Sequence, residues 1–427
     1  METAPLFVEP TANQKPPIVL RQYQHECIER ILLSREQQGN ELVVLPTGAG
    51  KSIVIANLAS RLNVPILILQ PSKEILEQNY DKLCRYVPVE NIGIFSASMG
   101  QKDVGTHFTL ATIQSIYQVP EHFKHIKLVI IDEAHGLNPK AVGMYMKFLR
   151  AIGQPKCVGF TATPYRLDSM YIDWGQENAR IVTTIKLINR MKGFFWSKIL
   201  FNMSMADLIS MGYLCSPTYI DASVIEQQEI PLNVSRSEFD MVKFDEMMTS
   251  REDKIMKTIA YGEANSKSVL IFCSSVHQAN KFQKMVEGSA VVTAKTPKKE
   301  RDQIISDFKE HRVKTVFNVG VLTMGFDHPS LDCIILLRPT RSMMLYVQMV
   351  GRGVRISEGK TTCKIIDLTS NVKNLGRVET IRLVKEAGSM WELWSETGQW
   401  HAKELYSFSV DNKMVSVPSF SSLGVPF

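Results

Sequence analysis

The chain has 427 residues, of which 44% are hydrophobic and 22% charged, so its composition is that of a globular protein and excludes disorder throughout. This length exceeds what one ordinary core holds, and we expect two domains of usual size. The 49 Lys and Arg residues outnumber the 43 Asp and Glu residues by six, a balance that is compatible with nucleic-acid binding but does not establish it.

The cysteines and the amino-terminal sequence indicate in which cellular compartment the protein is expected. The seven cysteines lie far apart, with no CxxC pair and no Cys/His cluster, so we expect neither a disulfide framework nor a zinc knuckle. The opening METAPLFVEP lacks the basic start and apolar run of a signal peptide. No apolar run approaches the roughly 20 residues that a membrane span needs. We therefore expect a cytoplasmic protein without a membrane partner.

The first predicted element is a helix in LRQYQHECIERIL. Tyr23, Cys27 and Ile31 recur in it at helical spacing. Arg21 and Gln24 stand at its beginning, and an amide offers both a donor and an acceptor to the edge of an adenine ring. A solvated polar helix face is the alternative for these two residues.

A glycine-rich turn follows, between a predicted buried strand at 42–45 and a predicted helix. Lys51 and Ser52 open that helix, so positive charge, a metal-binding hydroxyl and the helix N-terminus converge on one anion. Leu45 departs from the small residue that usually begins this pattern, and a chance glycine-rich turn is the alternative. The candidate nucleotide-binding residues are Thr47, Gly48, Ala49, Gly50, Lys51 and Ser52.

Two more predicted strands, VPILILQ and HFTLAT, run into polar residues. Ser72 is a plausible N-cap whose helix could hold a phosphate of a polymer. Thr112 and Gln114 follow the second strand, and polar residues at the ends of parallel strands line the crevice where such sheets bind ligands. Each of the three is equally explained as a plain cap.

KLVIIDEAHG places two carboxylates at the end of another apolar strand. Asp132 stands where a magnesium-binding carboxylate belongs, and Glu133 can activate a water against the terminal phosphate. His135 can link this site to the rest of the protein, although a lone His is more often structural. CVGFTATPYR then runs into the hydroxyls of Thr161 and Thr163. The alternation of strands and helices predicts a doubly wound parallel sheet.

The pattern breaks near Ser197, where we place a domain boundary, and resumes at SVLIFCSS. In this second half Thr323 and Asp327 lie in a loop after a strand, and Asp327 can bind a ribose hydroxyl or link the two lobes. Lys298 and Lys299 belong to the densest basic group and can follow a phosphate backbone, or they form a solvated face.

MLYVQMVGRGVR predicts a short helix that carries Gln348, Arg352 and Arg355. The two arginines are three residues apart and would share one face. Two guanidinium groups can neutralise charge that develops on a transferred phosphoryl group. A solvated basic helix is the alternative.

The ordered set PTGAGKS, DEAH, TATP, VLTMGFD and QMVGRGVR resembles the motor core of the superfamily-two helicases, over about residues 15 to 370. The resemblance implies an α/β fold with two RecA-like P-loop domains, parallel sheets and ATP between the lobes. It implies an ATP-binding domain over residues 1–196, a helicase C-terminal domain over 197–370 and a short extension over 371–427. ATP and Mg²⁺ are the implied cofactors.

The resemblance implies that residues of this chain at the positions of the family's motifs have the functional roles of those motifs. Arg21 and Gln24 match the adenine-reading motif, and Ser52 and Asp132 are the Mg²⁺ ligands. Catalysis falls to Glu133, Lys51, Gln348, Arg352 and Arg355, and coupling to Thr161 and Thr163. The nucleic-acid candidates are Ser72, Thr112, Gln114, Lys298, Lys299 and Thr323.

Within the superfamily, LPTGAGKS, TATPYR and LLRPT before QMVGRGVR look most like the bacterial RadD-type DNA repair helicases. This favours DNA over RNA, partners among repair or replication proteins, and a bacterial or bacteriophage setting. DEAD-box proteins carry SAT and HRxGR where this chain has TAT and Gln348-Met-Val-Gly-Arg. The cysteine-rich zinc module of RadD-type proteins is missing, which puts its contacts in doubt.

We therefore expect an ATP-dependent DNA helicase or translocase; one rival function is decided against by the arginines, and two remain open. A P-loop kinase or GTPase would share Lys51 and Asp132 but has no use for the arginines of the second half. An ATP-gated module that clamps, remodels or anneals DNA without separating strands would share every motif. An RNA helicase would do so as well.

Overall fold

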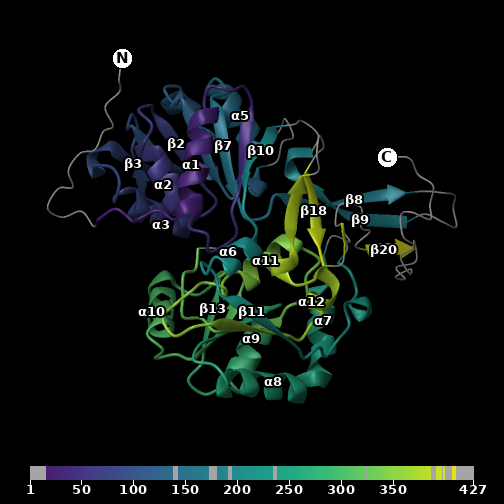
Figure 1. The fold of residues 1–427 in the computed structure, drawn as a ribbon. Helices are drawn as coiled ribbons and strands as arrows, with labels where there is room; N and C mark the ends of the chain where they lie inside the picture. Colours follow the sequence, from purple (N-terminus) through teal and green to yellow (C-terminus); the bar gives the residue numbers. More distant parts are fainter. Residues whose placement is uncertain are drawn as a thin grey trace. The chain divides into compact units, whose positions relative to one another are not determined.

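The computed structural model describes residues 16–137, 143–172, 180–190, 195–233, 238–323, 325–385, 391–396, 398–399 and 406–409. The chain divides into two compact units (Figure 1). Unit 1 comprises Met1–Tyr165 and Leu187–Met203, and unit 2 comprises Arg166–Lys186 and Ser204–Phe427.

Unit 1 is built on an eight-stranded sheet that is parallel except for the last strand at one edge. The strands in spatial order are β10 (Trp196–Asn202), β1 (Asn40–Val44), β7 (Lys156–Thr161), β6 (Leu128–Asp132), β2 (Ile66–Gln70), β5 (Phe108–Thr112), β3 (Ile92–Ser96) and β4 (Gln101–Lys102). The α-helices are α1 (Gln22–Ser34), α2 (Lys51–Ser60), α3 (Lys73–Leu83), α4 (Ile113–Ile116) and α5 (Met144–Ala151). Short 3-10 turns are η1 (Val89–Asn91), η2 (Ala97–Met99), η3 (Pro120–Phe123), η4 (Ala134–Gly136) and η5 (Ile188–Arg190).

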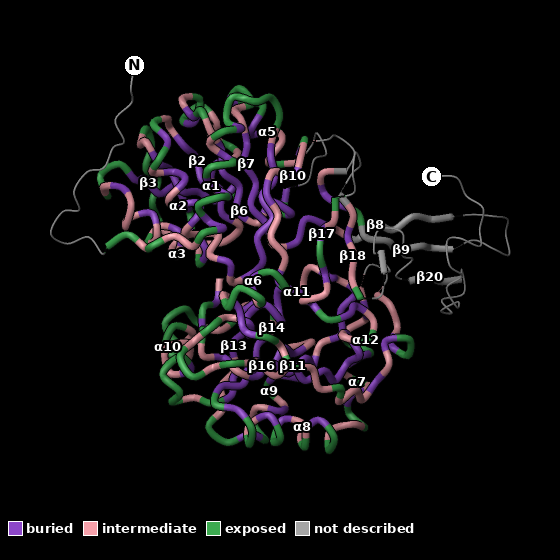
Figure 2. The backbone as a smooth tube through the Cα atoms, viewed as in Figure 1, coloured by how far each residue is buried: buried purple, intermediate pink, exposed green. Residues whose placement is uncertain are grey.

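The apolar runs of the sequence become the central strands of this sheet. Every residue of β2, β3 and β5 is buried, and the strands β2, β6 and β7 lie in the buried interior of the unit (Figure 2). Parallel strands that are covered on both faces need such near-continuous apolar sequence. Because all seven parallel strands end at one edge, the polar residues that follow them gather there.

Unit 2 contains a six-stranded, fully parallel sheet. Its order is β11 (Ser216–Asp221), β16 (Thr362–Asp367), β15 (Cys333–Leu337), β12 (Val269–Cys273), β14 (Thr315–Val319) and β13 (Ala290–Thr293). The helices are α6 (Met205–Ser210), η6 (Gln227–Glu229), α7 (Met241–Met248), η7 (Thr249–Arg251), α8 (Glu252–Ala264), α9 (Val276–Gln283), α10 (Lys298–Lys309), α11 (Met343–Val350), α12 (Asn371–Leu375) and η8 (Val378–Thr380).

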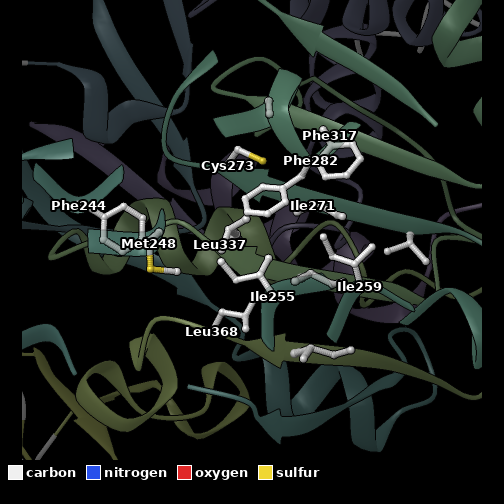
Figure 3. Packing of buried hydrophobic residues seen from close by; sticks show 14 of the residues in the cluster. Phe244, Met248, Ile255, Ile259, Ile271, Cys273, Phe282, Phe317, Leu337 and Leu368 are labelled. Carbon is white, nitrogen blue, oxygen red and sulfur yellow. The ribbon is translucent and has the colours of Figure 1, made fainter. Parts of the chain in front are cut away.

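One hydrophobic core of unit 2 lies between this sheet and three helices. Ile255 and Ile259 of α8 pack in one cluster with Ile271 of β12, and Phe244 of α7 and Phe282 of α9 belong to the same cluster (Figure 3). The spacing of four residues in α8 and the alternation along β12 place these side chains on one face of each element. The helices are therefore fixed to the sheet by their apolar stripes.

Two small sheets complete the described part of unit 2. One is antiparallel and contains β17 (Arg382–Lys385), β18 (Trp391–Ser395) and β19 (Gly398–Gln399). The other contains β8 (Tyr165–Ile172), β9 (Arg180–Leu187) and β20 (Tyr406–Ser409), with β20 antiparallel to β9. The sequence prediction contained neither sheet.

The predicted α/β class with parallel sheets is confirmed. The domain limits 1–196, 197–370 and 371–427 stay a prediction, and the limit near Ser197 falls inside β10, which pairs with β1. Among the described residues, no helix is both long enough and apolar enough to cross a membrane.

Candidate nucleotide and nucleic-acid sites

The turn between β1 and α2 depends on two glycines in the left-handed region. Gly48 has φ 87° and Gly50 has φ 77° and ψ 35°, a conformation that costs other residues free energy. A Cβ added at Gly50 would lie 2.6 Å from Nε2 of Gln24. Since α2 begins at Lys51, the unpaired N–H groups of its first turn and the positive end of its dipole lie at this turn.

Helix α1 fastens the same turn. The hydroxyl of Tyr23 donates to the carbonyl oxygen of Ala49 at 2.6 Å, and Nε2 of Gln24 donates to that oxygen at 3.0 Å. Oε1 of Gln24 accepts from the backbone N–H of Arg21 at 2.9 Å. Gln24 is 2% exposed, so a solvated helix face does not describe it. Its amide joins α1 to the glycine-rich turn, and its role toward adenine stays a prediction.

Asp132 is held at the end of β6 by two donors. Its Oδ1 accepts from the backbone N–H of Glu133 at 2.9 Å, and its Oδ2 accepts from Nδ2 of Asn79 at 3.0 Å. Burial raises the pKa of Asp132 to about 6, the charge of Glu133 acts in the same direction, and the ammonium of Lys51 opposes it. The carboxylate is therefore oriented by hydrogen bonds at a place where negative charge is costly without a cation.

Glu133 adopts a left-handed conformation, with φ 50° and ψ 51°. A residue with a Cβ occupies this region at a cost, and such positions cluster at functional sites. Oε1 of Glu133 lies 3.6 Å from Nζ of Lys51, and Oε2 lies 3.3 Å from Nδ1 of His135. The turn thus directs the carboxylate between the lysine of the glycine-rich turn and a histidine.

His135 continues these contacts to the end of β7. Its Nδ1 lies 2.9 Å from Oγ1 of Thr161 and 3.3 Å from Oγ1 of Thr163. The backbone N–H of Thr163 donates to Oγ1 of Thr161 at 3.0 Å, and all three residues are buried. Residues from three separate sequence motifs of unit 1 therefore form one chain of contacts, which runs from Lys51 through Glu133 to the threonines.

In unit 2, both predicted arginines converge on one carbonyl oxygen. Nη1 of Arg352 donates to the oxygen of Phe326 at 2.7 Å, and Nη1 of Arg355 donates to it at 3.1 Å. Arg355 also forms an ion pair with Asp327. Arg352 and Gln348 are buried, so the solvated basic helix does not describe Arg352. The two arginines of the QMVGRGVR motif are thus brought together with the end of the VLTMGFD motif.

The prediction that Gln348 and both arginines share one helix is wrong. Helix α11 ends at Val350, and Arg352 and Arg355 lie beyond it. Glycines at 351 and 353 weaken the helix, and turn bonds such as Gly353 N–H to the oxygen of Val350 replace its pattern. A Cβ on Gly353 would lie 2.3 Å from Sγ of Cys363, so the turn packs directly against β16.

The nucleic-acid candidates lie at helix starts and loop positions within each unit. Ser72 caps α3 by accepting from the N–H of Ile75 at 3.4 Å, which is the plain role that the sequence left open. Oγ1 of Thr112 lies 2.8 Å from Oγ of Ser115. Gln114 is exposed, Thr323 is buried, and Lys298 and Lys299 are exposed where α10 begins. Their binding roles stay predictions.

Two residues at the site were missed in the sequence, Tyr23 and Asn79. Tyr23 fits the apolar stripe of its helix, so its spacing gives no sign that its hydroxyl donates to the glycine-rich turn. Asn79 sits between Ile75 and Leu83 on the buried stripe of α3. A polar residue in an apolar helical stripe is a signal that needs a partner, since buried polar groups are rarely left without one.

Two family models match the chain. The model of the type III restriction enzyme res subunit matches residues 17–166, and the model of the helicase conserved C-terminal domain matches residues 250–357. The first covers the glycine-rich turn and the DEAH turn, and the second covers both arginines. The chain belongs to the superfamily-two helicases.

Relatives of this helicase include IRC3 of Saccharomyces cerevisiae, which is 27% identical over 82% of this chain and 51% of its own length. Another is the DNA 3'-5' translocase XPB2 of Sulfurisphaera tokodaii, 23% identical over 80% of each chain. The helicase chain spans about half the length of the first of these relatives.

Solved structures agree with the fold of the helicase. The type ISP restriction-modification enzyme LlaBIII bound to DNA superposes with a TM-score of 0.60 and 17% identity, over 83% of this chain and 28% of that one. Dbp5 of S. cerevisiae, bound to RNA and ADP BeF3, superposes with a TM-score of 0.55 and 17% identity, over 85% and 86%. At these identities the likeness concerns the fold alone. A specific likeness to RadD-type proteins stays a prediction.

Proposed function

We propose that this helicase is an ATP- and Mg²⁺-dependent nucleic-acid motor, a DNA helicase or translocase of repair, recombination or replication-fork processing. The observation that supports it most is the chain of contacts from Lys51 through Glu133 and His135 to Thr161. It links a phosphate-binding lysine, a base for water and a buried coupling segment. A protein that only bound nucleotide would not need such a chain.

In this proposal the glycine-rich turn from Thr47 to Ser52 holds the phosphates. Its backbone N–H groups and the α2 dipole favour negative charge, and Lys51 adds a full positive charge. Arg21 and Gln24 recognise the adenine ring, and Asp327 receives a ribose hydroxyl. Binding energy is thus distributed along the whole nucleotide.

Ser52 and Asp132 are the residues that would hold Mg²⁺. In nucleotide sites this ion takes one or two protein ligands and completes its shell with phosphate oxygens and water. Among the described residues, no three His, Cys, Asp or Glu side chains are placed so that they could hold a metal ion by themselves, and none is required for such a site. The burial that raises the pKa of Asp132 to about 6 also fits, because a cation there relieves the cost of its charge. The bound ion supplies positive charge to the phosphate oxygens.

Hydrolysis requires a base and charge neutralisation. Glu133 takes the proton of the attacking water, and its left-handed backbone fixes the direction of the carboxylate. Lys51, Arg352 and Arg355 neutralise the charge that develops on the transferred phosphoryl group, with Gln348 orienting groups beside them. Thr161 and Thr163 transmit the change to the rest of the protein through His135.

DNA is the proposed polymer. A relative named as a DNA translocase supports this choice, together with the resemblance of the motifs to DNA repair helicases. Backbone phosphates are bound by Ser72, Thr112, Gln114, Lys298, Lys299 and Thr323. Repair or replication proteins are the proposed partners.

The test is steady-state ATP hydrolysis with single-stranded DNA, duplex DNA, forked DNA and RNA, each at saturating Mg²⁺. We expect DNA to stimulate hydrolysis and Lys51→Ala to abolish the stimulated rate. Stimulation by RNA alone would make the protein an RNA helicase. A stimulated ATPase that neither separates strands nor moves along DNA would make it the clamping or annealing module. No stimulation by any polymer would contradict a motor.

A further inference from the structure

Asn79 connects helix α3 to the acidic end of β6. It is 3% exposed, and its Nδ2 donates to Oδ2 of Asp132 across 53 positions of sequence. Only the amide nitrogen can donate to a carboxylate, so the orientation of this side chain is set by the contact. Its Oδ1 is buried and has no hydrogen-bond partner among the described residues. The hydrogen bond to Asp132 is therefore the one contact that satisfies the buried amide of Asn79 among the described residues.

A second buried amide lies in the same row of strand ends. Gln70 pairs in register with Thr112 of β5, and Leu69 pairs with Ile131 of β6. Continuing the second register places Gln70 beside Asp132, on the same face of the sheet, in strands about 4.8 Å apart. Gln70 is 0% exposed, and neither of its amide atoms has a hydrogen-bond partner in the described structure.

Such amides cost folding free energy when no partner satisfies them, so each calls for an explanation. In this row Thr112 is a proposed nucleic-acid contact, and Asp132 is the proposed Mg²⁺ ligand. Gln70 lies between the two, and no described residue uses the hydrogen-bonding capacity of its amide. Gln70 and Oδ1 of Asn79 would therefore be able to form new hydrogen bonds if this row shifted.

Helix α3 joins this row to the other proposed nucleic-acid contact. Ser72 caps its first turn, and Asn79 follows seven residues later, nearly two full turns along the helix. Positions seven apart lie on the same face, so one rigid element carries Ser72 at its end and the partner of Asp132 on its side. A shift of α3 on binding a phosphate backbone would move the donor of Asp132.

We propose that Asn79 is a positioning residue for the Mg²⁺ site, and that α3 transmits nucleic-acid binding to the carboxylate of Asp132 through it. The inference rests on the proposed function, because it takes Asp132 as the metal ligand. The amide fixes one oxygen of Asp132 while the N–H of Glu133 fixes the other. Removing a residue that hydrogen-bonds to a metal ligand typically weakens metal affinity by about 10- to 100-fold.

The test measures Mn²⁺, used in place of Mg²⁺, binding to the full chain with ADP by electron paramagnetic resonance. Asn79→Asp keeps the shape of the side chain but sets a second carboxylate against Asp132. Asn79→Leu removes the donor without adding charge, and circular dichroism shows whether each variant folds. The matched control is Asn91→Asp, the same change at an exposed position of η1.

We expect Asn79→Leu to weaken Mn²⁺ binding by at least about tenfold, because one oxygen of Asp132 loses its donor. Asn79→Asp loses the same donor but adds negative charge that attracts the cation, so it should weaken binding less, and Asn91→Asp should bind like the wild type. Single-stranded DNA should change the Mn²⁺ affinity of the wild type by at least about threefold and leave that of Asn79→Leu unchanged. Mn²⁺ affinity within twofold of wild type in both Asn79 variants overturns the positioning role. An equal DNA effect in wild type and Asn79→Leu overturns the transmission.

Titration of a fluorescent ADP without metal separates these failures from failure of the proposed function. If the wild type binds the nucleotide and the Asn79 variants bind Mn²⁺ normally, only the positioning role is lost. If the wild type binds no nucleotide, the proposed function fails, and the inference falls with it.

Discussion

Among single residues, Glu133 is the one on which the proposed ATP hydrolysis depends most. Its carboxylate lies between Lys51 and His135, and its backbone is held in the left-handed region. We expect Glu133→Gln to keep ATP and Mg²⁺ binding and to lose most turnover, because an amide cannot take a proton from water. General bases typically contribute about 10² to 10⁴ in rate. Steady-state hydrolysis and a nucleotide-binding titration measure the two effects separately.

The control for this substitution is Glu121→Gln, the same change at an exposed position of unit 1. It should hydrolyse ATP like the wild type. A rate for Glu133→Gln close to that of wild type would remove Glu133 as the base.

The residues of the nucleotide site were predictable where chemistry and local spacing coincide. Lys51 and Ser52 follow a glycine turn, and Asp132 follows an apolar run, so each carries its signal in neighbouring sequence. The bond from Asn79 to Asp132 joins positions 53 apart, and only the register of the folded sheet and the placement of α3 create it. Contacts of that kind have no local pattern.

At the scale of elements, the DEAH turn rests on a glycine of the neighbouring strand. A Cβ on Gly159 of β7 would lie 2.4 Å from Cη2 of Trp196 and 2.7 Å from Cβ of Ala134. We expect Gly159→Ala to lower the free energy of unfolding by about 1–3 kcal/mol, because the packed neighbours must move. Denaturant titration measures this loss. Gly136→Ala, where an added Cβ meets no atom within 4 Å, should be nearly neutral, and equal losses would contradict the packing argument.

The start of α10 presents the proposed phosphate contacts of unit 2. Lys298 and Lys299 are exposed there, and each phosphate contact adds about 0.7 to the log–log salt slope on single-stranded DNA. Replacing both by Ala should therefore reduce the slope by about 1.4, as measured by DNA binding over a range of salt concentrations. The control replaces Lys254 and Lys257, two exposed lysines of α8. An unchanged slope would leave Lys298 and Lys299 as a solvated face.

Element types were more predictable than element ends and edges. The apolar runs that became β12, β14 and β15 were found in the sequence, because buried parallel strands are apolar along their length. Strand β10 was not, because its exposed Ser197 and partly exposed Lys198 interrupt the apolar pattern at the edge of the sheet. Helix α11 ends earlier than predicted, because the packing of Gly353 on Cys363 is a tertiary contact.

At the scale of the whole molecule, the proposed function assigns nucleotide binding to unit 1 and charge neutralisation to Arg355 of unit 2. Arg355 forms an ion pair with Asp327 and donates to the carbonyl oxygen of Phe326. A guanidinium that acts mainly in the transition state affects the rate rather than the affinity for ATP. Arginines in this role contribute about 10³ to 10⁵ in kcat in other phosphoryl-transfer enzymes.

The most direct test is therefore kcat of Arg355→Ala at saturating DNA, beside a nucleotide-binding titration, with Arg312→Ala as the control at an exposed arginine of unit 2. We predict a loss of at least about a hundredfold in kcat, or about 2.7 kcal/mol at 1.36 kcal/mol per decade, with little change in nucleotide affinity. Arg312→Ala should keep the wild-type rate. A kcat for Arg355→Ala within a few-fold of wild type would contradict the account of two units acting in one reaction.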